Sequence, residues 1–174
     1  MFIVSESGHY VISTGIVSFT FSQYHPDMAT DVRVELRIAC PRAEIAAYMF
    51  EPNNDAAWTS GVVAVNPLTP GRLRIGSRVE RTVKFLGKRF SYTYEVVDAR
   101  DDTFVEMTVT EPFPMHVRYE LESVDASATN VAIHARGDAS GFYKLMSPIM
   151  NRMVRRNIRR DLEGLERALT RRGG

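Results

Sequence analysis

Apolar residues recur at steps of three and four along the last part of the chain, residues 141–172. On an α-helix this spacing gathers them on one stripe, so the pattern predicts a single long amphipathic helix. Such a helix must bury its stripe, and a sheet formed by the preceding residues is the obvious partner. The stripe comprises Phe142, Leu145, Met146, Ile149, Met150, Met153, Val154, Ile158, Leu162, Leu165 and Leu169.

Strict alternation of apolar and polar residues begins earlier, at Asp31. In residues 31–38, valine, leucine and isoleucine alternate with arginine and glutamate, which is the period of a strand with one buried face. Short turns separate the later apolar segments, so neighbouring strands should pair antiparallel. Six further strands are predicted at residues 62–68, 78–86, 89–99, 103–110, 115–124 and 130–136.

Two short helices are predicted between the first and second strands. Pro41 suits the first turn of a helix and Glu44 suits its positive end, which indicates a helix through Phe50. Pro52 and the polar residues 53–55 end this helix and cap a second one that stops near Trp58. Strands segregated from helices indicate an α+β fold, here a curved antiparallel sheet of about seven strands around a long C-terminal helix.

Six local stretches add to this order of elements: residues 41–45, 58–62, 76–78, 85–90, 94–96 and 150–156. Together they resemble the START-like superfamily (SRPBCC, helix-grip fold), in particular its bacterial polyketide cyclase/dehydrase and lipid-transport branch. The resemblance implies a seven-stranded sheet wrapped around the C-terminal helix, with a cavity between them for a hydrophobic molecule. It implies no particular reaction, because the superfamily shares no single catalytic motif.

We expect one ligand-binding domain over residues 31–172, because 174 residues suffice for one core and are short for two. Residues 1–30 would form an N-terminal extension, either an appended strand or a disordered tail. Residues 1–26 contain no lysine or arginine, unlike the rest of the chain. A further possibility is therefore that translation begins at Met28 and that residues 1–27 do not belong to the native protein.

Aromatic and methionine residues are the candidates for a ligand-binding pocket. Phe90, Tyr92 and Tyr94 alternate on one strand, so they share one face of the sheet as core packing or as a pocket wall. Buried tyrosine hydroxyls need partners, which suits a pocket of some polar character, and methionine adapts to irregular partners. The predicted ligand-binding residues are Phe85, Tyr92, Tyr94, Met107, Tyr119, Met146, Met150 and Met153.

No catalytic residue can be assigned from the sequence. Glu95 and Glu106 are out of phase with the apolar faces of their strands and should point outward, although Glu95 would become a candidate general base if the aromatic face pointed outward. Cys40 precedes a helix, which could lower its pKa, but it fits better as a small buried side chain. No metal or cofactor is expected, since phosphate-binding glycine motifs are absent and the histidines lack ligand spacing. The histidines are His9, His25, His116 and His134, of which the last two should be exposed.

Charge is concentrated at the C-terminal end. The net charge is +1, yet residues 141–174 carry nine basic and three acidic residues. The arginine face is a candidate contact for an anionic membrane or an acidic protein, whereas nucleic acid is not expected. A single cysteine, no apolar run of membrane-spanning length and no signal-peptide pattern indicate a cytoplasmic protein. The arginines of this candidate contact are Arg152, Arg155, Arg156 and Arg159.

Three hypotheses of function follow. The first is a carrier or sensor that binds a lipid, an isoprenoid quinone or a polyketide-like molecule between the sheet and the helix. The second is a cyclase or dehydratase that uses the same cavity to fold a flexible chain for reaction. The third is a regulatory or toxin-like interaction protein that acts through the basic helix face.

Overall fold

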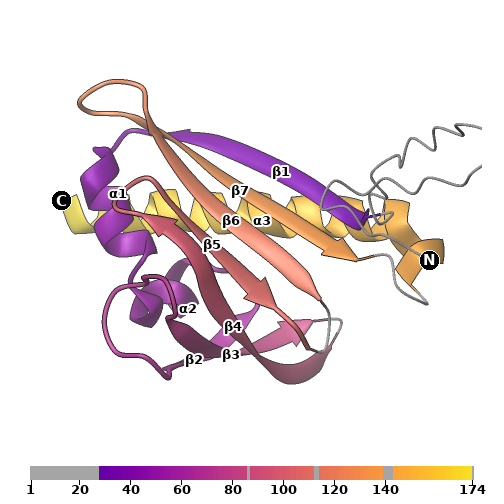
Figure 1. Ribbon diagram of the computed structural model, residues 1–174. Helices are drawn as coiled ribbons and strands as arrows, with labels where there is room; N and C mark the ends of the chain where they lie inside the picture. The colour runs from indigo at the N-terminus through magenta and orange to yellow at the C-terminus, as the bar shows by residue number, and fades with distance from the viewer. Residues whose placement is uncertain (1–27, 86, 112–113, 139–142, 174) are drawn as a thin grey trace, which may run out of the picture.

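The computed structural model describes residues 28–85, 87–111, 114–138 and 143–173 (Figure 1). It contains a seven-stranded antiparallel sheet, two short helices and a 3₁₀ turn before the second strand, and a long helix after the last strand, which confirms the predicted α+β helix-grip fold. The strands are β1 (Met28–Ile38), β2 (Val62–Pro67), β3 (Arg78–Phe85), β4 (Lys88–Arg100), β5 (Phe104–Val109), β6 (Met115–Ser123) and β7 (Thr129–Asp138). The helical elements are α1 (Arg42–Met49), η1 (Pro52–Asn54), α2 (Asp55–Trp58) and α3 (Tyr143–Gly173).

Strands β2 to β7 form an antiparallel meander, and β1 pairs with β7 to form one edge of the sheet. Its order is β1-β7-β6-β5-β4-β3-β2, and every neighbouring pair is antiparallel, as the short turns predict. At the tight turn between β3 and β4, Gly87 has a φ of 79°, a conformation that residues with a Cβ rarely adopt. β1 begins at Met28 rather than at Asp31. Most of the predicted N-terminal extension, residues 1–27, lies outside the described residues.

One face of the sheet is buried and faces α3. On β1, Val32 and Val34 are buried while Arg33 between them is exposed, as the alternation predicts. The α3 residues Ile158, Leu162 and Leu165 belong to the same core cluster. In Figure 1, α3 runs behind the sheet, and β1 is the strand that it contacts most.

A glycine brings α3 against α2. A side chain at Gly164 would collide with the carbonyl oxygen of Trp58, so the close approach of the two helices requires glycine here. Nearby, the carboxylate of Asp161 accepts a hydrogen bond of 2.5 Å from the backbone N–H of Ser60. Helix α3 therefore packs against the segment that carries Trp58 as well as against β1.

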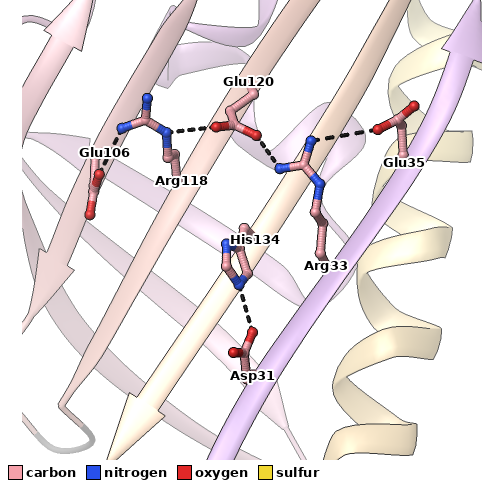
Figure 2. A network of polar contacts seen from close by, with 7 residues as sticks. All are labelled: Asp31, Arg33, Glu35, Glu106, Arg118, Glu120 and His134. Atoms are coloured by element: carbon pink, nitrogen blue, oxygen red, sulfur yellow. Dashed lines mark hydrogen bonds and ion pairs between the residues drawn. The ribbon is translucent and has the colours of Figure 1, made fainter. Parts of the chain in front are cut away.

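The outer face of the sheet carries a network of ion pairs across four strands (Figure 2). Arg118 on β6 lies between Glu106 and Glu120, at 2.8 Å from each carboxylate, and Glu120 continues the chain to Arg33 on β1. Burial acts to raise the pKa of Glu120, but the two arginines hold its pKa below the ordinary value. A pit of about 320 Å³ over Ala132 lies beside these side chains. Because its charges are mutually paired, we regard this network as stabilising the sheet.

Histidines on this outer face differ in exposure. His116 is exposed as expected, but His134 is half-buried, and its ring nitrogen Nε2 lies 2.6 Å from Oδ1 of Asp31 on the neighbouring strand. Within the described residues, no group of three or more histidine, cysteine, aspartate or glutamate side chains could hold a metal ion.

Candidate functional site

A buried ion pair lies on the inner face of the sheet, where only apolar residues would be expected. Arg81 on β3 and Asp55 at the start of α2 are 5% and 1% exposed. Arg81 Nε donates a hydrogen bond of 2.7 Å to Asp55 Oδ2, and Nη2 lies 2.6 Å from the same oxygen. Burying two charges is costly unless they pair closely, so such a pair beneath a sheet needs an explanation beyond stability.

Aromatic rings surround the ion pair. Tyr94 lies one strand away with its ring centroid 4.6 Å from the Arg81 guanidinium, and Tyr92 is the direct cross-strand neighbour of Arg81. The rings of Trp58 and Tyr119 also meet edge to face, with centroids 5.7 Å apart. Strands β3, β4 and β6 together with α2 thus contribute to one polar cluster within an apolar interior.

Burial sets the protonation of this cluster. It raises the pKa of Tyr94 far above its ordinary value and that of Tyr119 to about 12, although Arg81 opposes both shifts, so both phenols remain protonated at neutral pH. Burial also raises the pKa of Asp55, against the opposing effect of Arg81. For Arg81, burial acts to lower the pKa, but Tyr119 and Asp55 keep it well above the usual value. The cluster therefore combines a permanent cation with proton-bearing hydroxyls.

Several polar atoms of the cluster lack a partner. Tyr94 Oη, Trp58 Nε1 and Asp55 Oδ1 are buried, and none has a hydrogen bond within the described part of the chain. A buried polar atom without a partner costs about 1–3 kcal/mol, so native proteins rarely keep several together without a use for them. The atoms comprise two donors and one acceptor, which suits a ligand that carries oxygen atoms.

The predicted ligand-binding residues divide into two groups. Tyr94, Met107 and Tyr119 are buried on the inner face, while Tyr92 packs against the core and Met153 on α3 is half-buried. The side chains of the other three predicted residues lie outside the described residues, and a role in ligand binding stays a prediction for the whole set. Those three residues are Phe85, Met146 and Met150.

Asp55, Trp58 and Arg81 were not predicted as site residues. The sequence held a signal for Arg81, because it has the same parity along its strand as the inward-facing Val79. Asp55 gave no such signal, since a polar residue before a short helix is typical of a helix cap. Only the fold brings this aspartate beneath the sheet.

The other residues considered for catalysis do not belong to this cluster. Glu95 is exposed on the outer face, so it is not a general base in the interior. Glu106 lies on the same outer face, as predicted, and pairs with Arg118 and Arg136. Burial and the neighbouring Glu44 raise the pKa of Cys40, so the lowered pKa that a helix dipole could have given is not found.

The arginine face of α3 is exposed. Arg155 Nη1 donates a hydrogen bond of 3.2 Å to the carbonyl oxygen of Arg33, whereas Arg152, Arg156 and Arg159 make no ion pair with a described residue. No helix in the described ranges is long and apolar enough to cross a bilayer.

The order and pairing of the elements define a helix-grip fold, a curved antiparallel sheet around a long C-terminal helix. A family model described as polyketide cyclase / dehydrase and lipid transport matches residues 29–170, and the chain belongs to this family. Among curated proteins, no sequence matches the chain.

Solved structures share the fold at low sequence identity. The protein TTHA0849 of Thermus thermophilus superposes with a TM-score of 0.71 at 15% identity, covering 83% of this chain and 99% of that one. The Zhui aromatase/cyclase of Streptomyces sp. R1128 gives 0.71 at 17% identity, with 83% and 95% covered. A START superfamily protein of Mycobacterium smegmatis gives 0.68 at 12%, with 81% and 97% covered.

Proposed function

We propose that this protein binds a hydrophobic small molecule between the sheet and α3, with an oxygen-bearing end of the ligand at the Arg81–Asp55 pair. The observation that carries the proposal is the group of buried atoms without partners in the described residues, Tyr94 Oη, Trp58 Nε1 and Asp55 Oδ1, gathered around a buried cation. A carrier for a purely apolar molecule would gain nothing from this cluster. A ligand oxygen that accepts from the tyrosine or from the indole would recover the lost hydrogen-bond energy.

The ligand class follows from the mixed character of the interior. Buried aliphatic and methionine side chains such as Met107 and Val96 would cover an apolar body, at about 25 cal/mol per Å² removed from water before ordering costs. Carbonyl or phenolic oxygens would then meet Arg81 and Tyr94. Isoprenoid quinones and polyketide-like aromatics combine both features, whereas a hydrocarbon lacks the oxygens. The family membership supports this class.

A second candidate function, a cyclase or dehydratase, rests on the protonation of the cluster. Arg81 would polarise a substrate carbonyl, and a phenol that stays protonated at neutral pH could give its proton to the developing oxyanion. The Zhui structure is that of an aromatase/cyclase, but at 17% identity it shares the fold alone. Carrier and enzyme differ in whether the bound molecule leaves unchanged.

The experiment is the identification of what the purified protein holds. Native mass spectrometry followed by organic extraction should reveal a hydrophobic molecule with at least one carbonyl or hydroxyl group. In parallel, menaquinone and the anthraquinone emodin should displace 1-anilinonaphthalene-8-sulfonate from the protein, and Arg81→Met should weaken that displacement. Protein that carries no molecule, and in which neither compound displaces the dye, would contradict the proposal.

Turnover separates the two functions. Tyr92→Phe and Tyr94→Phe should leave the binding of an apolar probe within a small factor in a carrier. In an enzyme, loss of the proton-donating hydroxyl should abolish conversion of the extracted molecule while binding persists. The cytoplasmic location stays a prediction from the sequence.

A further inference from the structure

A hollow of about 410 Å³ lies between α2 and α3. Ala56 and Ala57 of α2 and Gly164 of α3 line it with little side-chain bulk. Three arginines of α3 line the same hollow: Arg160, Arg167 and Arg171. No acidic residue is among the described residues that form its wall.

The three arginines form one row. Their spacing of seven and four residues places them on one side of α3, and the row extends over about 17 Å at 1.5 Å per residue. All three are exposed, and none has a carboxylate within 4 Å in the described ranges. The glutamates of this half of the helix, Glu163 and Glu166, form no ion pair there either. The cations are therefore available to an external partner.

We infer that this hollow, here called the α2–α3 groove, is a docking site for an acidic segment of a partner protein. Charge complementarity selects carboxylates, because guanidinium groups bind them with directed hydrogen bonds. The concave shape selects a segment with side chains that enter the hollow beside Ala57, which a flat bilayer surface cannot do. Among the large exposed apolar residues of the described chain, none lies on residues 151–172 of α3, so this part of the helix offers none of them for insertion into lipid.

The geometry also specifies the segment. A helix that lies along α3 with glutamates at positions i, i+7 and i+11 would present one carboxylate to each arginine. Such an interaction is independent of the interior cluster, and it gives the exposed end of α3 a role that ligand binding does not supply.

The test uses the full chain and a fluorescein-labelled, alanine-rich helical peptide with glutamates at i, i+7 and i+11. A peptide of the same composition with glutamates at i, i+2 and i+5 is the register control. Fluorescence anisotropy should show binding of the first peptide that weakens with added salt, and clearly weaker binding of the second. Arg160→Gln/Arg167→Gln/Arg171→Gln should weaken binding about tenfold, since three exposed ion pairs are lost.

Matched variants distinguish the effect of the groove on peptide affinity from the effect of net charge. Arg78→Gln/Arg89→Gln/Arg100→Gln removes the same charge from exposed sites on β3 and β4 and should leave affinity within a factor of about two. Ala57→Trp fills the groove without changing charge and should abolish peptide binding, and circular dichroism checks that it folds. Ala56→Phe serves the same purpose if Ala57→Trp does not fold.

Three results would overturn the inference. The first is equal binding of both peptides, the second is an equal loss in the two triple variants, and the third is unchanged binding in the groove-filled variants. A final measurement tests binding to phosphatidylcholine vesicles that contain phosphatidylserine. If they bind through the same three arginines while the peptide does not bind, the face meets a membrane and the inference fails.

Discussion

Arg81 Nε donates to Asp55 Oδ2 over 2.7 Å in an interior where the surrounding strands bury valine, methionine and tyrosine. The two residues come from different elements, β3 and α2, so the pair also joins the sheet to the short helix before it. Both stability and the proposed ligand site therefore depend on the same contact.

Removing the arginine alone should be costly. Arg81→Met leaves Asp55 buried without its partner, and we expect a loss of about 3 kcal/mol in the free energy of unfolding at neutral pH. The double variant Asp55→Leu/Arg81→Met should recover most of that loss. Urea unfolding followed by circular dichroism measures both, and Arg78→Met on the exposed face of the same strand is the control.

The cost of Arg81→Met should depend on pH. Burial raises the pKa of Asp55, and without Arg81 the carboxyl would bind its proton still more readily. The variant should therefore lose less stability at low pH, where a neutral carboxyl is buried, than at neutral pH. An equal loss at both would mean that the missing side-chain volume, rather than the charge, sets the effect.

Gly164 should not tolerate even the smallest side chain. Glycine to alanine inside a helix ordinarily stabilises by about 1 kcal/mol, but a Cβ here would strike the Trp58 carbonyl oxygen. We expect the cost of this clash to exceed the gain in helix propensity, so Gly164→Ala should lower the free energy of unfolding by about 2 kcal/mol. Thermal unfolding tests this, with Thr170→Ala on the exposed side of α3 as the control; a more stable Gly164→Ala protein would contradict the packing.

Asp161 should make stability fall as pH rises. Burial raises its pKa from 3.8 to about 6, partly opposed by its hydrogen bonds from Ser60. A raised folded-state pKa means that the folded protein holds the proton more tightly, so the stabilising contribution is present below about pH 4 and is lost between about pH 4 and 6. Asp161→Asn keeps an acceptor for Ser60 and should remove this fall, which is at most about 3 kcal/mol. Urea midpoints at a series of pH values measure it; a parallel pH profile in the variant would contradict the assignment.

The fold was accessible from the sequence because its signals are local. The alternation in residues 31–38 and the apolar stripe of residues 141–172 predicted β1 and α3, and the short turns predicted the antiparallel order. Arg81 shows where such reasoning stops. Its parity placed it on the buried face, but an arginine is expected there only when a partner is known. That partner, Asp55, lies 26 residues away in the chain and meets it only through the fold.

Tyr94→Phe offers the sharpest test of the candidate site, because its two expected effects have opposite signs. The Tyr94 hydroxyl is buried without a hydrogen bond in the described residues, so its removal should stabilise the ligand-free protein by about 1 kcal/mol. The same removal should weaken binding of an oxygen-bearing ligand such as emodin severalfold, since the donor that meets the ligand is gone. Thermal unfolding of delipidated protein and dye displacement measure the two quantities. Tyr48→Phe, a buried tyrosine on α1 outside the cluster, is the control; a destabilised Tyr94→Phe protein with unchanged emodin binding would show that the hydroxyl serves the fold rather than a ligand.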